Sequence, residues 1–227
     1  MILTIIIACV LIFLIHSIIP TYYNKWFNRD VKKNTDKDNE IMLTFDDGPD
    51  KRYIYELLDV LDENKVKAVF FMVAQNAEKN PDVVNEIKSR GHKIGLHSWQ
   101  HKNAMLYSYL YTKKDFENSL RIMNKLGIDT KLYRPPWGHT NIFSNYFVKK
   151  YKMKYVFWDV MAEDWEASAT KDSIQNKLLE RTTERSIICL HDAGENSGGA
   201  KGAPLNTIEG LKIAIPKLKE KGYKFIV

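Results

Sequence analysis

The chain has 227 residues, of which 44% are hydrophobic and 27% charged, so it is long enough for one large domain with a sizeable core. The formal net charge of +6 comes from lysines spread along the chain, with no arginine-rich run and no basic stripe between aromatic residues. This composition argues against nucleic-acid binding and predicts a solvated, lysine-rich surface. Cys9 and Cys189 lie in an apolar run and in a predicted strand, so we expect no disulfide.

The first predicted element is an apolar helix over residues 2–19, which contain no charged side chain. Eighteen helical residues extend roughly 27 Å, just enough to cross a hydrocarbon core. Pro20 is expected to end the helix, and aromatic residues suited to a membrane interface follow, among them Tyr22 and Trp26. A cleaved signal peptide is the alternative, but no basic residue precedes the run and no small-residue cleavage site is evident. We therefore predict a single-pass anchor over residues 1–20.

Residues 21–40 are predicted to be a linker, because they are polar and aperiodic from residue 27 onward. Four basic residues, Lys25, Arg29, Lys32 and Lys33, closely follow the apolar run, and none precedes it. By the positive-inside rule they favour a cytoplasmic body, so the orientation in the membrane stays open at this point. The body is expected to span residues 41–227.

Short apolar runs alternate with amphipathic stretches throughout the body. The predicted strands are 41–45, 67–73, 93–96, 131–134, 153–158, 186–190 and 223–227. The predicted helices are 51–64, 81–90, 112–126, 141–151, 171–182 and 205–221. This alternation predicts a parallel α/β architecture, and the pattern alone does not separate a barrel from an open sheet.

Polar clusters follow five of the predicted strands. They are DDGPD, HSWQH, RPPWG, DVMAEDW and HD, after the first, third, fourth, fifth and sixth strands. The carboxyl ends of parallel strands lie on one face of the fold, where α/β proteins gather their functional groups. The clusters therefore predict a single site.

Within this site, His97 and His101 are four residues apart, a spacing that would put both imidazoles on one side of a helical turn. Two histidines and an aspartate leave open positions on a divalent ion, as catalytic sites require. Adjacent residues at a strand end point to opposite sides, so one carboxylate of the Asp46–Asp47 pair could face the ion while the other faces a water. The alternative for the aspartate pair is a turn or helix cap, because Asp-Gly-Pro is common in turns.

Five motifs in this order resemble those of the polysaccharide deacetylases, carbohydrate esterase family four. They are TFDDGP (44–49), HSWQH (97–101), RPPWG (134–138), WDVMAEDW (158–165) and CLHD (189–192). The resemblance covers residues 41–227. It implies a distorted (β/α) barrel of the polysaccharide deacetylase type and metal-dependent removal of acetyl groups from N- or O-acetylated sugars.

The resemblance also implies roles for individual residues. Asp47, His97 and His101 would be the metal ligands, and Asp46 the general base. The cofactor would be one divalent ion, for which the donors suit Zn²⁺ best, although Co²⁺, Mn²⁺ and Fe²⁺ fit the same set. Arg134 should pair with Asp46 and keep it ionised.

The remaining implied residues surround the reacting amide. The Trp137 N–H would help hold the tetrahedral oxyanion, and His191 would be the general acid, paired with Asp164. Trp165 would form a wall of the acetyl pocket. Cys189 departs from the family, which usually has an aliphatic residue there, so the pocket is expected to be slightly wider.

We therefore expect a membrane-anchored, metal-dependent N-deacetylase of a glycan such as peptidoglycan or chitooligosaccharide, with an extracellular catalytic domain. The expected partners are the glycan and the membrane, with no nucleic acid and no obligate protein partner. One alternative is a deacetylase of a small or lipid-linked N-acetyl glycoside at the cytoplasmic face. Another is a tethered sugar-binding protein with a vestigial site.

Overall fold

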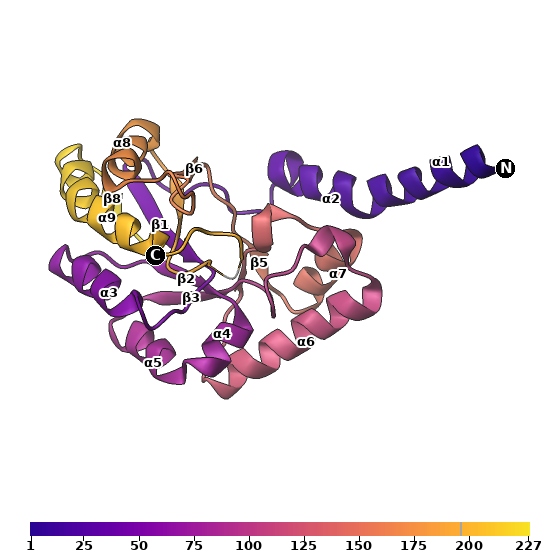
Figure 1. Cartoon of the computed structure of the whole chain (residues 1–227), viewed down its shortest axis with the longest axis horizontal. Helices are drawn as coiled ribbons and strands as arrows, with labels where there is room; N and C mark the ends of the chain where they lie inside the picture. Colours follow the sequence, from indigo (N-terminus) through magenta and orange to yellow (C-terminus); the bar gives the residue numbers. More distant parts are fainter. Residues whose placement is uncertain (196) are drawn as a thin grey trace.

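The computed structural model describes residues 1–195 and 197–227, and its centre is a curled parallel sheet with helices outside it (Figure 1). Its strands run in the order β5-β4-β3-β2-β1-β7-β6, with β8 beside β1. The strand bounds are β1 Glu40–Asp46, β2 Val69–Met72, β3 Lys93–Leu96, β4 Leu132–Tyr133, β5 Lys154–Tyr155, β6 Val160–Met161, β7 Ile187–His191 and β8 Lys224–Phe225. Within the described residues β5 and β6 are not paired, so the barrel is distorted and open on that side, in agreement with the predicted fold class.

The outer helices of the body alternate with the strands along the chain. They are α3 Ile54–Glu63, α4 Ala74–Lys79, α5 Pro81–Ser89, α6 Tyr109–Lys125, α7 Ile142–Lys150, α8 Lys171–Arg181 and α9 Ala203–Glu220. Two short 3₁₀ turns, η3 Ala104–Leu106 and η4 Pro136–Gly138, lie in the loops before α6 and α7. The six predicted helices are present with shifted ends, and α4 is an additional helix that the sequence pattern did not indicate.

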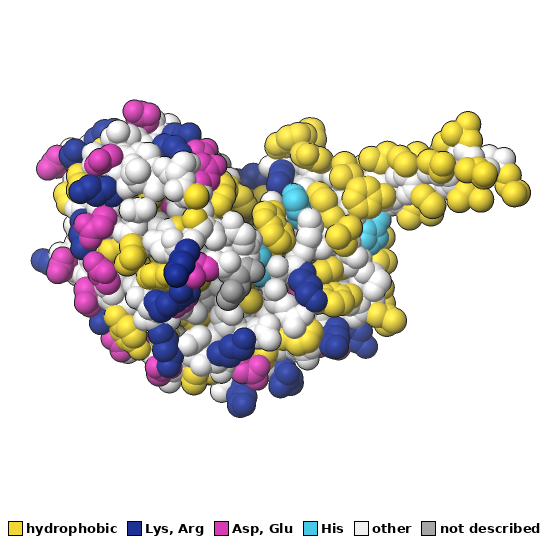
Figure 2. Space-filling view, in the orientation of Figure 1, with side chains coloured by type: hydrophobic (Ala, Val, Ile, Leu, Met, Phe, Trp, Pro, Cys, Tyr) yellow, Lys and Arg dark blue, Asp and Glu magenta, His cyan; other side chains and the backbone are white. Residues whose placement is uncertain are grey.

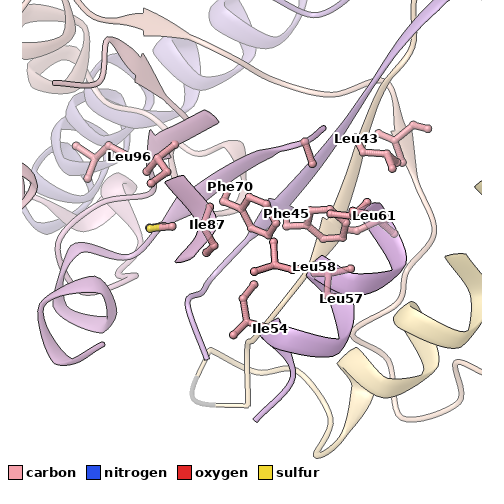
Figure 3. Close-up of a cluster of buried hydrophobic side chains, with 14 of the residues drawn as sticks. Leu43, Phe45, Ile54, Leu57, Leu58, Leu61, Phe70, Ile87 and Leu96 are labelled. Carbon is pink, nitrogen blue, oxygen red and sulfur yellow. The ribbon is translucent and has the colours of Figure 1, made fainter. Parts of the chain in front are cut away.

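The main core lies between the sheet and the helices (Figure 3). Phe45 of β1 stacks on Phe70 of β2 with ring centroids 5.1 Å apart. On α3, Leu57, Leu58 and Leu61 recur at helical spacing and are fully buried against these strands. This packing fixes the end of β1, which carries the aspartate pair.

The predicted strand 153–158 is wrong in extent, because only β5 falls within it and the next strand, β6, begins at Val160, beyond its predicted end. The backbone oxygens between them serve Arg134 instead of a strand partner: Nε donates to Val156 O at 3.0 Å and Nη2 to Phe157 O at 3.3 Å. Lys32 also pairs with this segment, since its N–H donates to Tyr155 O. The chain therefore turns out of the sheet at the point where it supports the arginine.

The N-terminal helix does not end at Pro20. It runs continuously from Ile2 to Phe27 as α1 Ile2–Phe13, η1 Leu14–Ile18, α2 Ile19–Tyr22 and η2 Tyr23–Phe27, with η1 and η2 in π-helical form. Pro20 lies inside this continuous helix, just after the π-helical turn η1, and its missing N–H leaves one gap in the backbone hydrogen bonds of the helix. By length and composition this helix could cross a membrane, a property that a signal sequence shares.

Residues 28–40, within the predicted linker, lie along the body. Val31 and Thr35 are buried, and isolated bridges join Lys32 to Val156 and Asn34 to Ser186. This segment therefore connects the N-terminal helix to β1 in a fixed arrangement.

Candidate active site

Asp47, His97 and His101 are brought together from the ends of β1 and β3. One potential ligand atom from each lies within 4.8 Å of the others. Asp47 Oδ1 is 2.9 Å from His101 Nε2 and 3.4 Å from His97 Nε2. The predicted ligand residues thus form one cluster, although neither histidine is in a helix.

Left-handed backbone conformations replace the expected helical turn and the expected strand alternation. Residues 97–103 form a loop in which Ser98 has φ +73° and His101 has φ +53°. Asp47 has φ +78°, which takes it out of the β1 geometry. Its carboxylate therefore faces the same cavity as that of Asp46 instead of the opposite side. Strained residues of this kind are concentrated at functional sites.

The hydrogen bonding of this cluster fits a divalent cation. His97 Nδ1 lies 2.7 Å from Arg134 O, and a carbonyl can only accept, so Nδ1 carries the hydrogen. This bond fixes the ring with Nε2 directed toward Asp47, as in metal-binding histidines whose other ring nitrogen donates to a carbonyl. Asp47 Oδ1 is buried and, among residues 1–195 and 197–227, makes no well-directed hydrogen bond, despite its short distances to both rings. Three electron-pair donors that face one another in this way are complementary to a metal ion.

Asp46 is held by the fully buried guanidinium of Arg134. Arg134 Nη1 donates to Asp46 Oδ1 at 2.7 Å and to Thr44 Oγ1 at 2.6 Å. The guanidinium also lies over the Phe71 ring, 4.2 Å from its centroid. The guanidinium therefore holds the Asp46 carboxylate in one orientation beside the cavity.

Cys189 is adjacent to this carboxylate. Its buried Sγ lies 3.5 Å from Asp46 Oδ2, close enough for a weak S–H hydrogen bond. Burial and the charge of Asp46 raise the pKa of the thiol, so it stays protonated. The thiol therefore contacts the second oxygen of Asp46, where an aliphatic side chain could only pack.

His191 and Asp164 form a second imidazole–carboxylate pair on the same cavity. His191 Nδ1 lies 2.9 Å from Asp164 Oδ1, and the His191 backbone N–H donates to Asp164 Oδ2 at 2.8 Å. Thr207 Oγ1 donates to the same oxygen. Burial lowers the pKa of His191, but Asp164 together with Asp47 and Asp46 outweighs it and raises the pKa to about 9. The ring is therefore a proton donor near neutral pH.

These groups line a cavity of about 330 Å³. Trp137 and Trp165 stand at its walls: Trp137 meets the His101 ring edge-on at 4.5 Å, and Trp165 meets the His191 ring at 5.2 Å. Trp137 is held by η4 with φ +55° and follows two prolines, which supply no N–H groups. The cavity thus has tryptophan on either side of the carboxylates and imidazoles.

Comparison with known proteins agrees with this geometry. Residues 33–156, more than half of the chain, match the polysaccharide deacetylase family. The chain belongs to this family. Two peptidoglycan-N-acetylglucosamine deacetylases of Bacillus cereus are similar to it: one is 33% identical over 82% of this chain and 66% of the relative, the other 31% identical over 91% and 92%.

Solved structures of the family are similar as well. The Bc1960 peptidoglycan N-acetylglucosamine deacetylase superimposes with a TM-score of 0.77 at 32% identity, covering 86% of this chain and 89% of that one. A family 4 acetyl xylan esterase from Clostridium thermocellum, solved with a cobalt ion, has a TM-score of 0.71 at 30% identity, covering 82% and 87%. Polysaccharide deacetylases of this group are metal-dependent hydrolases.

The structure brings all ten predicted site residues together. The residues that line the cavity are Asp46, Asp47, His97, His101, Trp137, Trp165, Cys189 and His191. Arg134 and Asp164 lie behind it, each bonded to a lining residue. Their roles in the reaction are proposals, which we develop below.

Sequence reasoning missed several residues of this polysaccharide deacetylase site. Trp158 and Met161 line the cavity, and both stand in the motif WDVMAEDW, so position in the motif could have indicated them. Asp192 accepts a hydrogen bond from Gly48 N at 3.1 Å, and a Cβ on Gly48 would lie 2.1 Å from its carboxylate. Glycine is therefore required at position 48. Thr207, far from any motif, offered no sequence signal.

Proposed function

We propose that this protein is a metal-dependent deacetylase that removes the N-linked acetyl group from an amino sugar of peptidoglycan or a chitooligosaccharide. One observation carries the proposal. A carboxylate held by arginine, Asp46, and an imidazole held by carboxylate, His191, face a single cavity that also contains the Asp47–His97–His101 cluster. Hydrolysis of an amide needs a base, an acid and an electrophile in this arrangement. The names of the similar proteins support the glycan substrate.

Asp47, His97 and His101 would hold one divalent cation. When bound there, the ion would polarise the acetyl carbonyl and make an adjacent water more acidic. We propose Zn²⁺, which two histidines and one aspartate suit; Co²⁺, Mn²⁺ and Fe²⁺ fit the same donors, and availability decides among them.

Asp46 is proposed as the general base. Arg134 holds its Oδ1, so the side chain is fixed with Oδ2 beside Cys189 and 3.9 Å from His97 Nε2, both of which line the cavity. The carboxylate takes a proton from the water whose oxygen adds to the acetyl carbon. The N–H of Trp137 is proposed to donate to the oxyanion that forms, and Trp165 to bound the space for the acetyl methyl group.

His191 is proposed as the general acid. The amide C–N bond breaks as its imidazolium gives a proton to the sugar nitrogen, and acetate and a free amine leave. Asp164 orients the ring through Nδ1 and favours its charged form, so Nε2 carries the proton that is transferred.

Acetate release tests this function. Peptidoglycan, chitooligosaccharides and small N-acetyl glycosides are each incubated with the full chain and a divalent metal, and acetate is measured. We expect release from the polymeric or oligomeric amino sugars. Glycan binding without acetate release would favour the alternative of a sugar-binding protein with a vestigial site. Acetate release from small glycosides alone would favour the alternative of a deacetylase for small or lipid-linked N-acetyl glycosides.

The proposed location is the cell membrane, with residues 1–20 as the anchor and residues 41–227 as an extracellular catalytic domain. A tethered catalytic domain suits a polymer fixed near the membrane. The basic residues after the helix favour the alternative, a cytoplasmic enzyme for small or lipid-linked glycosides. The test is a reporter, fused after Val227, that works only in the cytoplasm. Activity of this fusion would overturn the extracellular assignment.

A further inference from the structure

The C-terminal half of the N-terminal helix is fixed to the body by polar side chains on one face. Ser17 Oγ donates to Met105 O at 2.6 Å, Thr21 Oγ1 donates to Thr140 O at 2.8 Å, and Asn24 Nδ2 donates to Thr140 Oγ1 at 3.0 Å. All three of these helix side chains are buried. This half of the helix is therefore part of the folded body. Residues 1–15 are all exposed, and the α1 end of the helix projects from the body (Figure 1).

The projecting part is too short to cross a bilayer alone. Residues 2–15 form roughly 21 Å of helix, against about 30 Å of hydrocarbon. The apolar run continues to Ile19, but from residue 16 onward the helix already contacts the body. If the helix crosses the membrane, the body surface beside residues 16–19 must reach the lipid.

That surface carries exposed hydrophobic side chains. Leu106 is 78% exposed and Leu110 75% exposed, and Ile142 and Tyr146 on α7 are also exposed. We call these four residues the interfacial patch. The 3₁₀ turn with Leu106 contacts η1, and the ring of Phe143, next to Ile142, is 5.3 Å from that of His16. In Figure 2, hydrophobic side chains continue from the projecting helix on to the body beside it.

Lysines border the patch. Lys113 and Lys114 follow Leu110 by one helical turn, and Lys149 and Lys150 follow Tyr146 at the end of α7. Apolar side chains bordered by lysine are typical of surfaces that insert into the headgroup region of anionic membranes.

We propose that the interfacial patch is seated in the headgroup region of a phospholipid bilayer, beside the point where the N-terminal helix enters it. This inference rests on the proposed membrane anchor. Helix α1 has no buried residue and is apolar on every face. A bilayer would cover all faces of this helix, whereas a second copy of the chain would cover only one. Because the interfacial patch is continuous with this helix, we assign both to the same bilayer.

The placement has a consequence for the substrate. A hollow lined by Leu106, Tyr107 and Tyr111 also includes His101 and Trp137, so it joins the interfacial patch to the rim of the cavity. With the patch on the bilayer, the site acts on glycan close to the membrane surface.

Site-directed spin labelling tests the proposal in the full chain, reconstituted in mixed phosphatidylcholine–phosphatidylglycerol vesicles. Labels are placed in a Cys9→Ser background by Leu110→Cys or Tyr146→Cys. Leu205→Cys is the matched control, because Leu205 is 46% exposed at the start of α9, and Ile12→Cys reports on the anchor. The buried Cys189 stays, and the Cys9→Ser protein alone measures its residual labelling.

For spin labels at positions 110 and 146, relative to the label at position 205, we expect more frequent collisions with oxygen. We expect their collisions with a water-soluble nickel chelate to be severalfold less frequent. Equal nickel access at positions 110, 146 and 205, with position 12 protected, would overturn the patch and leave the anchor standing. Nickel access at position 12 would overturn both. Protection that depends on the protein-to-lipid ratio would assign the patch to a second copy and overturn the proposal. Acetate release by the Leu110→Cys protein on soluble chitooligosaccharide tests the proposed enzyme independently.

Discussion

At the scale of single residues, the two adjacent carboxylates have different surroundings. Asp46 is bonded to a fully buried guanidinium, while Asp47 faces two imidazole nitrogens and makes no well-directed hydrogen bond at Oδ1. Repulsion between them is offset by Arg134 on one side and would be offset by a cation on the other. This division of surroundings suits Asp46 to its proposed role as base and Asp47 to its proposed role as metal ligand.

Asp46→Asn tests that division. Asparagine cannot take a proton, so deacetylation should fall by roughly 10²–10⁴-fold, the usual contribution of a general base. Bound metal, measured by elemental analysis, should stay at the wild-type ratio because the ligands are untouched. The exposed Asp129→Asn variant is the control and should retain full activity. Undiminished acetate release by Asp46→Asn would contradict the base assignment.

Asp164→Asn tests the proton donor. As the proposed general acid, His191 must be protonated, so activity should be present below its pKa and fall as the pH rises through it. Asp164 helps to raise the pKa of His191 to about 9, so the neutral asparagine should move the alkaline limb of the kcat/KM profile to lower pH. Thr207→Val, which removes only one hydrogen bond to Asp164, should move this limb less. An unchanged alkaline limb in Asp164→Asn would exclude His191 as the acid.

At the scale of elements, the sequence predicted best where a buried strand is bounded by turn residues. The strands 41–45 and 93–96 are of this kind, because their apolar runs end in Asp-Gly-Pro and in a histidine loop. It missed α4, which has only six residues and too little periodicity to register. It also mistook the histidine loop for a helical turn, because the positive φ values of Ser98 and His101 depend on tertiary contacts that no spacing reveals.

The N-terminal helix also has features that depend on tertiary contacts and that the sequence pattern does not reveal. An apolar run is recognised from its average hydropathy, and in that average Ser17 and Thr21 are minor interruptions. Their importance comes from partners about 88 and 119 positions away along the chain, Met105 and Thr140. The ten predicted residues of the candidate site were easier to find because each of them stands within a motif that follows a strand.

Thr21→Val tests whether the helix is held to the body. Valine keeps the shape but leaves Thr140 N–H and O without their partner, which should weaken docking by about 1–3 kcal/mol. Hydrogen exchange at the Thr140 amide should then accelerate in detergent-solubilised protein. The matched control is Thr4→Val, on the exposed α1, which should leave that exchange unchanged. Equal exchange in the two variants would show that the contact contributes nothing.

At the scale of the whole molecule, the sheet joins parts of the site that are distant in the chain. β1 lies between β2 and β7, so Asp46 is directly opposite His191 in the register of β1 and β7. The loop after β3 brings His97 and His101 to the same end, and Arg134 after β4 reaches back to Asp46. An ion bound by Asp47, His97 and His101 would therefore link the ends of β1 and β3, and its binding energy would add to the stability of the fold.

Metal binding should consequently raise the thermal midpoint. A ligand at 100 times its Kd that binds only the folded state adds about 2.7 kcal/mol, and in a chain of this size that shifts Tm upward by about 5–10 °C. The experiment compares Tm after chelation and after Zn²⁺ addition, for the wild type and for His101→Ala. The wild type should shift and the variant should not, because the alanine variant keeps the fold but lacks a ligand. Equal shifts would place the bound metal elsewhere in the chain, and no shift in either protein would show that the cluster does not hold the ion. The comparison needs no substrate, so its outcome bears on the ligand set independently of which acetylated sugar the enzyme accepts.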